Sequence, residues 1–143
     1  MSDTTNRAGV RRFRVELADT DATGGIHHTA ALRWAEQTEQ QLLSALGLVD
    51  AIAFPRRRID VEFERALRYG DEFDVHIEIE AVGRTSVTYR WVGRLGDIVY
   101  FHGRSVAVHV RDGRPAPVPD ALARAAAPSA SPSTGSDAEQ GVT

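Results

Sequence analysis

The chain has 143 residues, with 20 acidic and 17 basic side chains and a formal net charge of −3. This length suits a single domain, and the charge excludes a general electrostatic attraction to nucleic acid or to an anionic membrane. Cysteine is absent, which excludes disulfides, thiolate nucleophiles and zinc–thiolate sites. No apolar run approaches the ~20 residues of a membrane span, and the polar start lacks the apolar stretch of a signal peptide. We therefore expect a cytoplasmic protein whose partner is a small molecule or another protein.

The first expected element is a strand over residues 10–18, in which apolar side chains alternate with charged ones. Phe13, Val15 and Leu17 would share the face that packs inward. The preceding residues 1–9 are polar, and we expect them to be flexible. The folded domain is therefore expected to start at residue 10.

A long helix is expected over residues 28–46, because its apolar side chains fill about half of the helix circumference. Gly47 follows in the position that commonly ends a helix. Glu39 falls within the apolar arc and Glu36 at its edge, and a carboxylate so placed must be paired, protonated or directed into a cavity. The simplest interpretation of Glu39 is an ion pair with an arginine of a neighbouring strand or subunit.

Four further strands are indicated by alternating apolar and polar residues separated by glycine-containing turns. They cover residues 57–67, 73–81, 87–91 and 98–110. In the first of them, the side chains expected to point inward are Ile59, Val61 and Phe63. One sheet of this kind can curl around one helix, but its edge or its other face then needs a partner, so oligomerisation is expected.

The composition changes near the end of the chain. A short helix is expected over residues 119–124, and the domain is expected to end at residue 126. Residues 127–143 are rich in serine, proline, glycine and aspartate and offer almost nothing to bury, so we expect a disordered tail.

The stretch between the first strand and the helix combines an acid, two glycines and a helix start. Asp21 supplies the carboxylate, and Gly24 and Gly25 permit backbone angles that other residues avoid. A helix N-terminus offers free N–H donors to a carbonyl oxygen that gains negative charge, while a nearby acid attacks or activates water. These features indicate acyl transfer without a serine nucleophile. The alternative is that Asp21 only caps the turn.

Three consecutive arginines, Arg56, Arg57 and Arg58, stand at the entrance of the second strand. Such a cluster is usually a solvated patch. Its functional interpretation is a binding site for the phosphates of coenzyme A or for an acidic acyl carrier protein. Arg84 and Ser86 are weaker candidates for the same role. No two histidines have the helical spacing of metal ligands, so neither a metal nor another cofactor is expected.

Residues 15–28, Val-Glu-Leu-Ala-Asp-Thr-Asp-Ala-Thr-Gly-Gly-Ile-His-His, resemble the opening motif of hot-dog-fold acyl-CoA thioesterases of the 4-hydroxybenzoyl-CoA thioesterase type. In that family a strand leads into Asp-Thr-Asp, a glycine, an apolar residue and Tyr-His, and then into the central helix. Residues 61–71 resemble the second strand of the family and its Gly-Asp turn, and the similarity extends over residues 10–124. The helix pattern of the family is matched by Leu32, Trp34 and Glu36.

The resemblance implies a hot-dog fold of the α+β class, in which a five-stranded antiparallel sheet wraps around one long central helix. It also implies a homodimer or homotetramer with active sites at the subunit interface. The substrate would be an acyl-CoA or an acyl carrier protein whose pantetheine arm threads between the subunits. Hydrolysis of its thioester would release a free acid and a thiol.

The resemblance also implies roles for individual residues. Asp21 would be the nucleophile or the general base. Backbone N–H groups near His28 and Thr29 would bind the oxyanion, and the side chain of His28 would orient the loop. Gly25 and His27 would contact the substrate, and His27 stands where the family has tyrosine.

A related branch of the family carries its acid on the helix after a His-Gly-Gly turn, which this chain lacks, so Glu36 is the second choice as catalytic acid. Ala31 replaces a tyrosine of the family, which predicts extra space for a bulky acyl group such as a polyketide chain. Glu39 replaces an arginine, which puts the interface ion pairing in doubt and could supply a second acid. Two alternatives remain open. One is a hydratase or dehydratase on the same fold, although the spacing of Asp21 from the histidines does not match it, and the other is a non-catalytic module that binds acyl thioesters.

Overall fold

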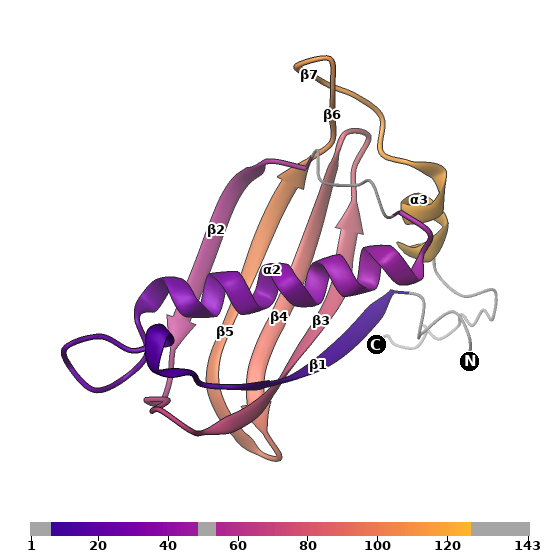
Figure 1. Cartoon of the computed structure of the whole chain (residues 1–143). Helices are drawn as coiled ribbons and strands as arrows, with labels where there is room; N and C mark the ends of the chain where they lie inside the picture. The colour runs from indigo at the N-terminus through magenta and orange to yellow at the C-terminus, as the bar shows by residue number, and fades with distance from the viewer. Residues whose placement is uncertain (1–6, 49–53, 127–143) are drawn as a thin grey trace, which may run out of the picture.

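The computed structural model describes residues 7–48 and 54–126. Five antiparallel strands form one sheet, and a single long helix lies across one of its faces (Figure 1). The strand order in the sheet is β1-β3-β4-β5-β2. The bounds are β1 Ala8–Arg14, α2 His28–Ala45, β2 Arg56–Phe63, β3 Glu72–Val82, β4 Ser86–Leu95 and β5 Ile98–Val108. The expected α+β class and hot-dog architecture are confirmed.

Four short elements complete the described part of the chain: η1 Leu17–Asp19, β6 Val110–Arg111, β7 Arg114–Pro115 and α3 Asp120–Ala126. No helix among the described residues is long and apolar enough to cross a membrane. The expected disordered tail, residues 127–143, and the first six residues of the expected flexible start lie outside the described residues. Ala8 and Gly9 already belong to β1, so the first strand begins earlier than expected.

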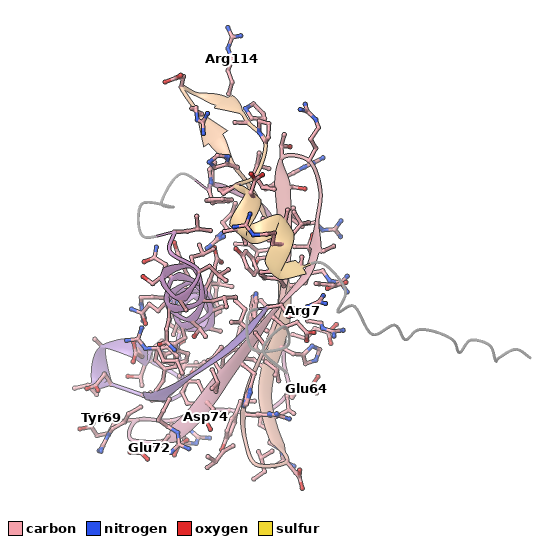
Figure 2. All side chains as sticks on the ribbon, turned by 90° about the vertical axis from the view of Figure 1, so that its right-hand side faces the viewer. Arg7, Glu64, Tyr69, Glu72, Asp74 and Arg114 are labelled. Carbon is pink, nitrogen blue, oxygen red and sulfur yellow. The ribbon has the colours of Figure 1, made fainter. Side chains whose placement is uncertain are left out.

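The core lies between α2 and the sheet, because one face of the helix and one face of each strand are apolar. On β3 the alternate residues Phe73, Val75, Ile77 and Ile79 are buried, as the alternation predicted. The helix contributes Trp34 and other side chains of the predicted apolar arc, and its end is marked by Gly47 at a φ of +80°. Figure 2 shows α2 nearly end-on, with the helix on one side of the sheet and Glu64 on the other.

Two expectations about the first strand are wrong. The strand ends at Arg14 rather than at residue 18, and the chain then turns into η1. Val15 is fully buried as expected, but Leu17 is 71% exposed because the turn takes it off the strand face. The same turn delivers Asp19 and the loop that follows it to the start of α2.

Strand β2 forms an edge of the sheet and pairs only with β5. It ends at Phe63 rather than at residue 67. Ile59 and Phe63 lie on the same face as the core, opposite Ser105 and Phe101 of β5, but they are 40% and 46% exposed. The expectation that they are buried inside one chain is therefore wrong, because α2 does not cover this edge.

Candidate active site

The loop between η1 and α2 is closed by its own backbone hydrogen bonds. The N–H of Asp21 donates to the carbonyl of Gly25 at 2.9 Å, and the N–H of Gly24 donates to the carbonyl of Asp21 at 3.0 Å. Gly24 has a φ of +88°, in the left-handed region that glycine adopts without strain. The N–H of Ile26 donates to the carbonyl of Leu67 at 3.0 Å, which ties the loop to the segment after β2.

The carboxylate of Asp21 is exposed and is held by Thr23. Its Oδ1 atom accepts hydrogen bonds from the backbone N–H of Thr23 at 2.9 Å and from the Thr23 hydroxyl at 2.5 Å. These bonds lower the pKa of Asp21, and the neighbouring His27 and His28 lower it further. Among the described residues no donor lies within hydrogen-bond distance of Oδ2. Asp21 therefore caps the turn with one oxygen, and its other oxygen, ionised at neutral pH, has no donor among the described residues.

The two backbone N–H groups that the resemblance implied as oxyanion donors, those of His28 and Thr29, differ in whether they are already hydrogen-bonded. His27 is the N-cap residue, and its Nδ1 atom accepts a hydrogen bond from the N–H of Thr29 at 3.2 Å. The Thr29 amide is therefore engaged by the helix cap, and its role as an oxyanion donor stays a prediction. The N–H of His28, the first residue of the helix, has no acceptor within the described part of the chain. His27 acts here as a helix cap, and its ring stacks on that of His28 with centroids 4.3 Å apart.

A cavity of about 330 Å³ lies between this loop, the start of α2 and the end of β2. Of the residues predicted from the sequence, Gly25 and His28 line it, whereas Asp21 does not; Asp21 is linked to the cavity through its hydrogen bonds to Thr23, which does line it. The lining residues are Thr23, Gly25, Ile26, His28, Phe63, Glu64, Arg65, Ala66 and Leu67. The cavity is large enough for the reacting end of a small-molecule substrate.

A second aspartate fixes the loop to the helix. Asp19 is buried, accepts a hydrogen bond from the N–H of Glu16 at 2.8 Å, and pairs with Arg33 of α2 at 2.5 Å. Sequence reasoning placed Asp19 in the loop but did not identify Arg33, because an arginine at the sixth position of a helix carries no signal of its own. The pair holds the Asp21 loop against the first turns of α2.

The buried acid of the helix is paired within the chain. Glu39 is 3% exposed, and its carboxylate lies 2.8 Å and 2.9 Å from the guanidinium nitrogens of Arg56 at the start of β2. This confirms the expected ion pair with an arginine of a neighbouring strand. Burial raises the pKa of Glu39, and the charge of Arg56 opposes that rise. Glu36 is exposed, 3.9 Å from Arg56, and does not line the cavity beside Asp21.

The basic candidates do not reach the cavity within one chain. Arg56 is engaged by Glu39, and Arg58 pairs with Asp60 at 2.9 Å, whereas Arg57 is exposed. All three lie at the start of β2, and Arg84 and Ser86 lie at the turn between β3 and β4. Figure 1 shows both places at the end of the sheet opposite the Asp21 loop.

Two further expectations concern space and metal. Ala31 is 0% exposed in the core, so the loss of a tyrosine there opens no pocket at the surface.

On the outer face of the sheet, the side chains that could hold a metal ion are Glu62, Glu64 and His102, whose ligand atoms lie within 4.8 Å of one another. His102 Nε2 lies 2.8 Å from a carboxylate oxygen of Glu64, so the arrangement also works as a surface ion pair. The expected absence of a metal stays a prediction.

The chain is similar to known proteins both in sequence and in fold. The family model of the thioesterase superfamily matches residues 23–101. A 1,4-dihydroxy-2-naphthoyl-CoA hydrolase of a Synechococcus strain is 27% identical over 127 residues, which cover 78% of this chain and 83% of that protein. The structure of a predicted thioesterase from Bacillus stearothermophilus is similar with a TM-score of 0.73 and 26% identity, covering 81% of this chain and 91% of that one.

A thioesterase from Thermus thermophilus, solved in complex with coenzyme A and zinc, has a TM-score of 0.75 and 24% identity. The match covers 83% of this chain and 98% of that one. At this identity the likeness shows the shared fold alone. The family match includes α2, β2, β3, β4 and the first residues of β5, whereas β1 and Asp21 precede it.

Proposed function

The chain belongs to the thioesterase superfamily, and we propose that it cleaves its thioester at the Asp21 loop. The proposal is supported by a cavity that is lined both by His28 and by Thr23. The backbone N–H of His28 has no acceptor among the described residues, and Thr23 holds the ionised carboxylate of Asp21. A carboxylate with a lowered pKa suits a nucleophile or a general base and does not suit a general acid.

In the proposed reaction, Asp21 Oδ2 attacks the carbonyl carbon of the thioester or removes a proton from the attacking water. The carbonyl oxygen becomes an oxyanion, and the N–H of His28 at the positive end of α2 stabilises it. The carbon–sulfur bond then breaks, and the sulfur leaves as a thiolate that takes up a proton. If Asp21 attacked, water hydrolyses the mixed anhydride between Asp21 and the acyl group, which frees Asp21 and supplies that proton; if Asp21 acted as a base, it passes the proton taken from water to the thiolate. Overall, one thioester and one water give one carboxylic acid and one thiol. The ring of His28 is proposed to orient the loop.

We propose a coenzyme A thioester as the substrate rather than an acyl carrier protein. The Synechococcus relative is named as the hydrolase of a CoA thioester, and the Thermus structure contains coenzyme A. The exposed guanidinium of Arg57 has the chemistry to bind a phosphate group. An acyl carrier protein presents the same pantetheine arm, so it remains the second candidate carrier.

The site is proposed to be completed by a second copy of the chain along the edge of β2. Ile59 and Phe63 are exposed apolar side chains on this unpaired edge, which favours strand pairing with another copy. In an antiparallel pairing centred on Asp60, Arg58 would face Glu62 of the partner subunit. The same register would bring Arg57 of the partner subunit to Phe63, which lines the cavity. This explains how arginines remote from Asp21 within one chain could bind the phosphates.

The proposal is tested by measuring thiol release from a panel of acyl-CoA thioesters and from one acyl carrier protein. Because the chain has no cysteine, a thiol reagent reports only the product. We expect release of free thiol from CoA thioesters at a higher kcat/KM than from the carrier protein. Hydration of an enoyl-CoA without thiol release would instead identify a hydratase. Tight binding without either reaction would identify a non-catalytic module.

A further inference from the structure

The segment that follows β2 brings two exposed arginines to the region of the Asp21 loop. Arg65 lines the cavity that the loop borders. Arg68 does not line the cavity, but its Nη1 atom lies 3.7 Å from the point that a Cβ atom on Gly24 would occupy. Gly24 belongs to the turn that carries Asp21. One arginine therefore borders the cavity, and the guanidinium of the other lies against the loop that forms one of its walls.

The backbone of this segment is fixed on both sides. The N–H of Arg65 donates to the carbonyl of Tyr100 on β5 at 3.2 Å. Leu67 is 0% exposed, and its carbonyl accepts a hydrogen bond from the N–H of Ile26 in the Asp21 loop at 3.0 Å. Arg68 follows Leu67 directly. Both arginines therefore start from a backbone that is already held in place, so little ordering of the chain opposes the binding of a ligand by their side chains.

Neither arginine forms an ion pair within residues 7–48 and 54–126. The nearest acids in the sequence have other contacts, because Glu64 is bound by His102 at 2.8 Å and Asp71 accepts the backbone N–H of Arg68 at 2.9 Å. The arginines that are paired with a carboxylate are Arg12, Arg33, Arg56, Arg58, Arg90 and Arg104. The guanidinium groups of Arg65 and Arg68 thus have no internal counter-charge in the described part of the chain.

Arg65 also lines a second hollow, which adjoins the cavity beside the Asp21 loop. This hollow has a volume of about 700 Å³ and is lined by Glu64, Arg65, Val99 and His102. The cavity and the hollow share Glu64 and Arg65, so they meet just beyond the end of β2. Figure 2 shows Glu64 on the side of the sheet that faces away from α2. A thioester that reacts in the cavity therefore has room to extend past Arg65 toward the outer face of the sheet.

We propose that Arg65 and Arg68 form an anion-binding site that holds a phosphate or carboxylate group of the substrate while its thioester lies at the Asp21 loop. The inference rests on the proposed function, since it assigns substrate recognition in the same reaction. Unlike the phosphate contact proposed for Arg57, this site lies within one chain.

The chemistry of a guanidinium selects this class of ligand. Its planar set of N–H donors forms two parallel hydrogen bonds with the oxygens of a phosphate or a carboxylate, and it stays positively charged at every working pH. A thioester substrate has two sources of such a group. One is the phosphates of coenzyme A, and the other is an acyl group that ends in a carboxylate. Recognition by Arg65 and Arg68 is the same for both, and the experiment separates the two sources.

The test measures thiol release from four thioesters that vary the carrier and the acyl group independently. Hexanoyl and adipoyl groups have the same number of carbon atoms, and only adipoyl ends in a carboxylate. Each is attached to coenzyme A and to pantetheine, which keeps the whole thiol arm and lacks the phosphates. The ratio of kcat/KM between the carriers reports a phosphate contact, and the ratio between the acyl groups reports a carboxylate contact. We expect at least one of these preferences in the wild-type protein.

The decisive variants are Arg65→Gln, Arg68→Gln and the double variant, which remove positive charge and keep polar side chains. Each single substitution should lower the preference for the anionic substrate by about tenfold, because one charge-assisted contact is lost. The loss should appear mainly as a higher KM. Arg65→Lys keeps the charge without the planar pair of donors, so it should keep part of the preference.

Arg114→Gln is the matched control, and it should leave both preferences unchanged. It makes the same change of charge at another exposed arginine. Figure 2 shows Arg114 at the end of the molecule opposite Tyr69, the residue that follows Arg68. Chemical denaturation checks that all variants are folded.

Loss of the carrier preference in the variants would identify a phosphate as the bound group, and loss of the acyl preference would identify a carboxylate. The inference would be overturned by a wild-type protein that shows neither preference, or by a double variant that keeps the wild-type preferences. Either result would leave the proposed function standing, because thiol is still released. Failure of the wild-type protein to release thiol from any of the four thioesters would overturn the proposed function and this inference with it.

Discussion

The Nδ1 atom of His27 accepts a hydrogen bond from the backbone N–H of Thr29 and thereby closes the first turn of α2. This contact distinguishes two adjacent amides that are otherwise equivalent at a helix start. The Thr29 amide is engaged by the His27 side chain, whereas the amide of His28 has no acceptor among the described residues. In the proposed reaction, the helix cap and the oxyanion donor are therefore different backbone groups.

Removing the cap should weaken the helix without removing the catalytic donor. The His27→Ala variant should lose about 1 kcal/mol of unfolding free energy, the usual effect of losing a side-chain cap. His27→Asn, which can accept the same hydrogen bond, should lose much less. Urea denaturation of the three proteins checks this, and equal stability of all of them would show that the cap contributes nothing.

The pKa of Asp21 is held down mainly by Thr23, so the acid limb of the pH profile should depend on Thr23. The Thr23→Val variant keeps the backbone N–H bond and loses the hydroxyl bond. Its Asp21 should have a higher pKa, and the acid limb of kcat/KM should move to higher pH. Because the folded pKa is lowered, the stabilisation from Asp21 is present above the unfolded pKa and is lost as pH falls through the folded one. An acid limb that does not move would exclude Asp21 as the group that must be ionised.

Removing one partner of the buried Glu39–Arg56 ion pair should lower the free energy of unfolding. In the Arg56→Gln variant the carboxylate of Glu39 loses its partner, and the unfolding free energy at neutral pH should fall by about 3 kcal/mol. Because burial raises the folded pKa of Glu39, the protonated form is favoured in the folded state. The contribution of Glu39 to stability is therefore greatest at low pH and is lost as pH rises through the folded pKa.

It follows that Arg56→Gln should be more destabilised at neutral pH than under mildly acidic conditions. Adding Glu39→Gln to that variant should restore much of the lost stability, because the uncompensated charge disappears. Chemical denaturation of the single and double variants at two pH values measures both effects. A double variant that is less stable than Arg56→Gln alone would contradict the assignment.

The exposed edge of β2 predicts a dimer. A charge introduced by Phe63→Glu on this edge should convert the assembly to monomers, measured by light scattering. Leu95→Glu is the matched control, because Leu95 is 39% exposed and Phe63 is 46% exposed, but Leu95 lies on β4, which β5 separates from the β2 edge. A wild-type protein that is already monomeric at working concentrations, or a variant that stays dimeric, would exclude this interface.

The helices and strands in which apolar residues recur at a regular spacing could be predicted from the sequence. The helix spacing before Gly47 and the alternation of Phe73, Val75 and Ile77 depend on near neighbours, and the structure follows both. The end of the first strand could not be predicted, because Leu17 continues the alternation although the chain has already turned. The exposure of Ile59 and Phe63 depends on the order of strands in the sheet, which periodicity does not reveal.

The position of the candidate site along the chain could be predicted from the sequence, but the contacts of its side chains could not. The loop acid and the helix start are adjacent in sequence, so their proximity follows from the chain. Which amide is free depends on the rotamer of His27, and which arginine meets Glu39 depends on how β2 docks against α2. The buried hydroxyl of Tyr89, which has no hydrogen-bond partner among the described residues, has no signature in the sequence.

The most direct test of the account is single-turnover thiol release by the Asp21→Asn variant, compared with wild type and with Asp97→Asn, a control in the hairpin between β4 and β5. The substitution keeps the side-chain oxygen that Thr23 binds and removes the negative charge. We predict that the fold and stability are unchanged and that the rate falls by about 10²-fold to 10⁴-fold, while the control keeps full activity. An Asp21→Asn variant that releases thiol at the wild-type rate would contradict the account.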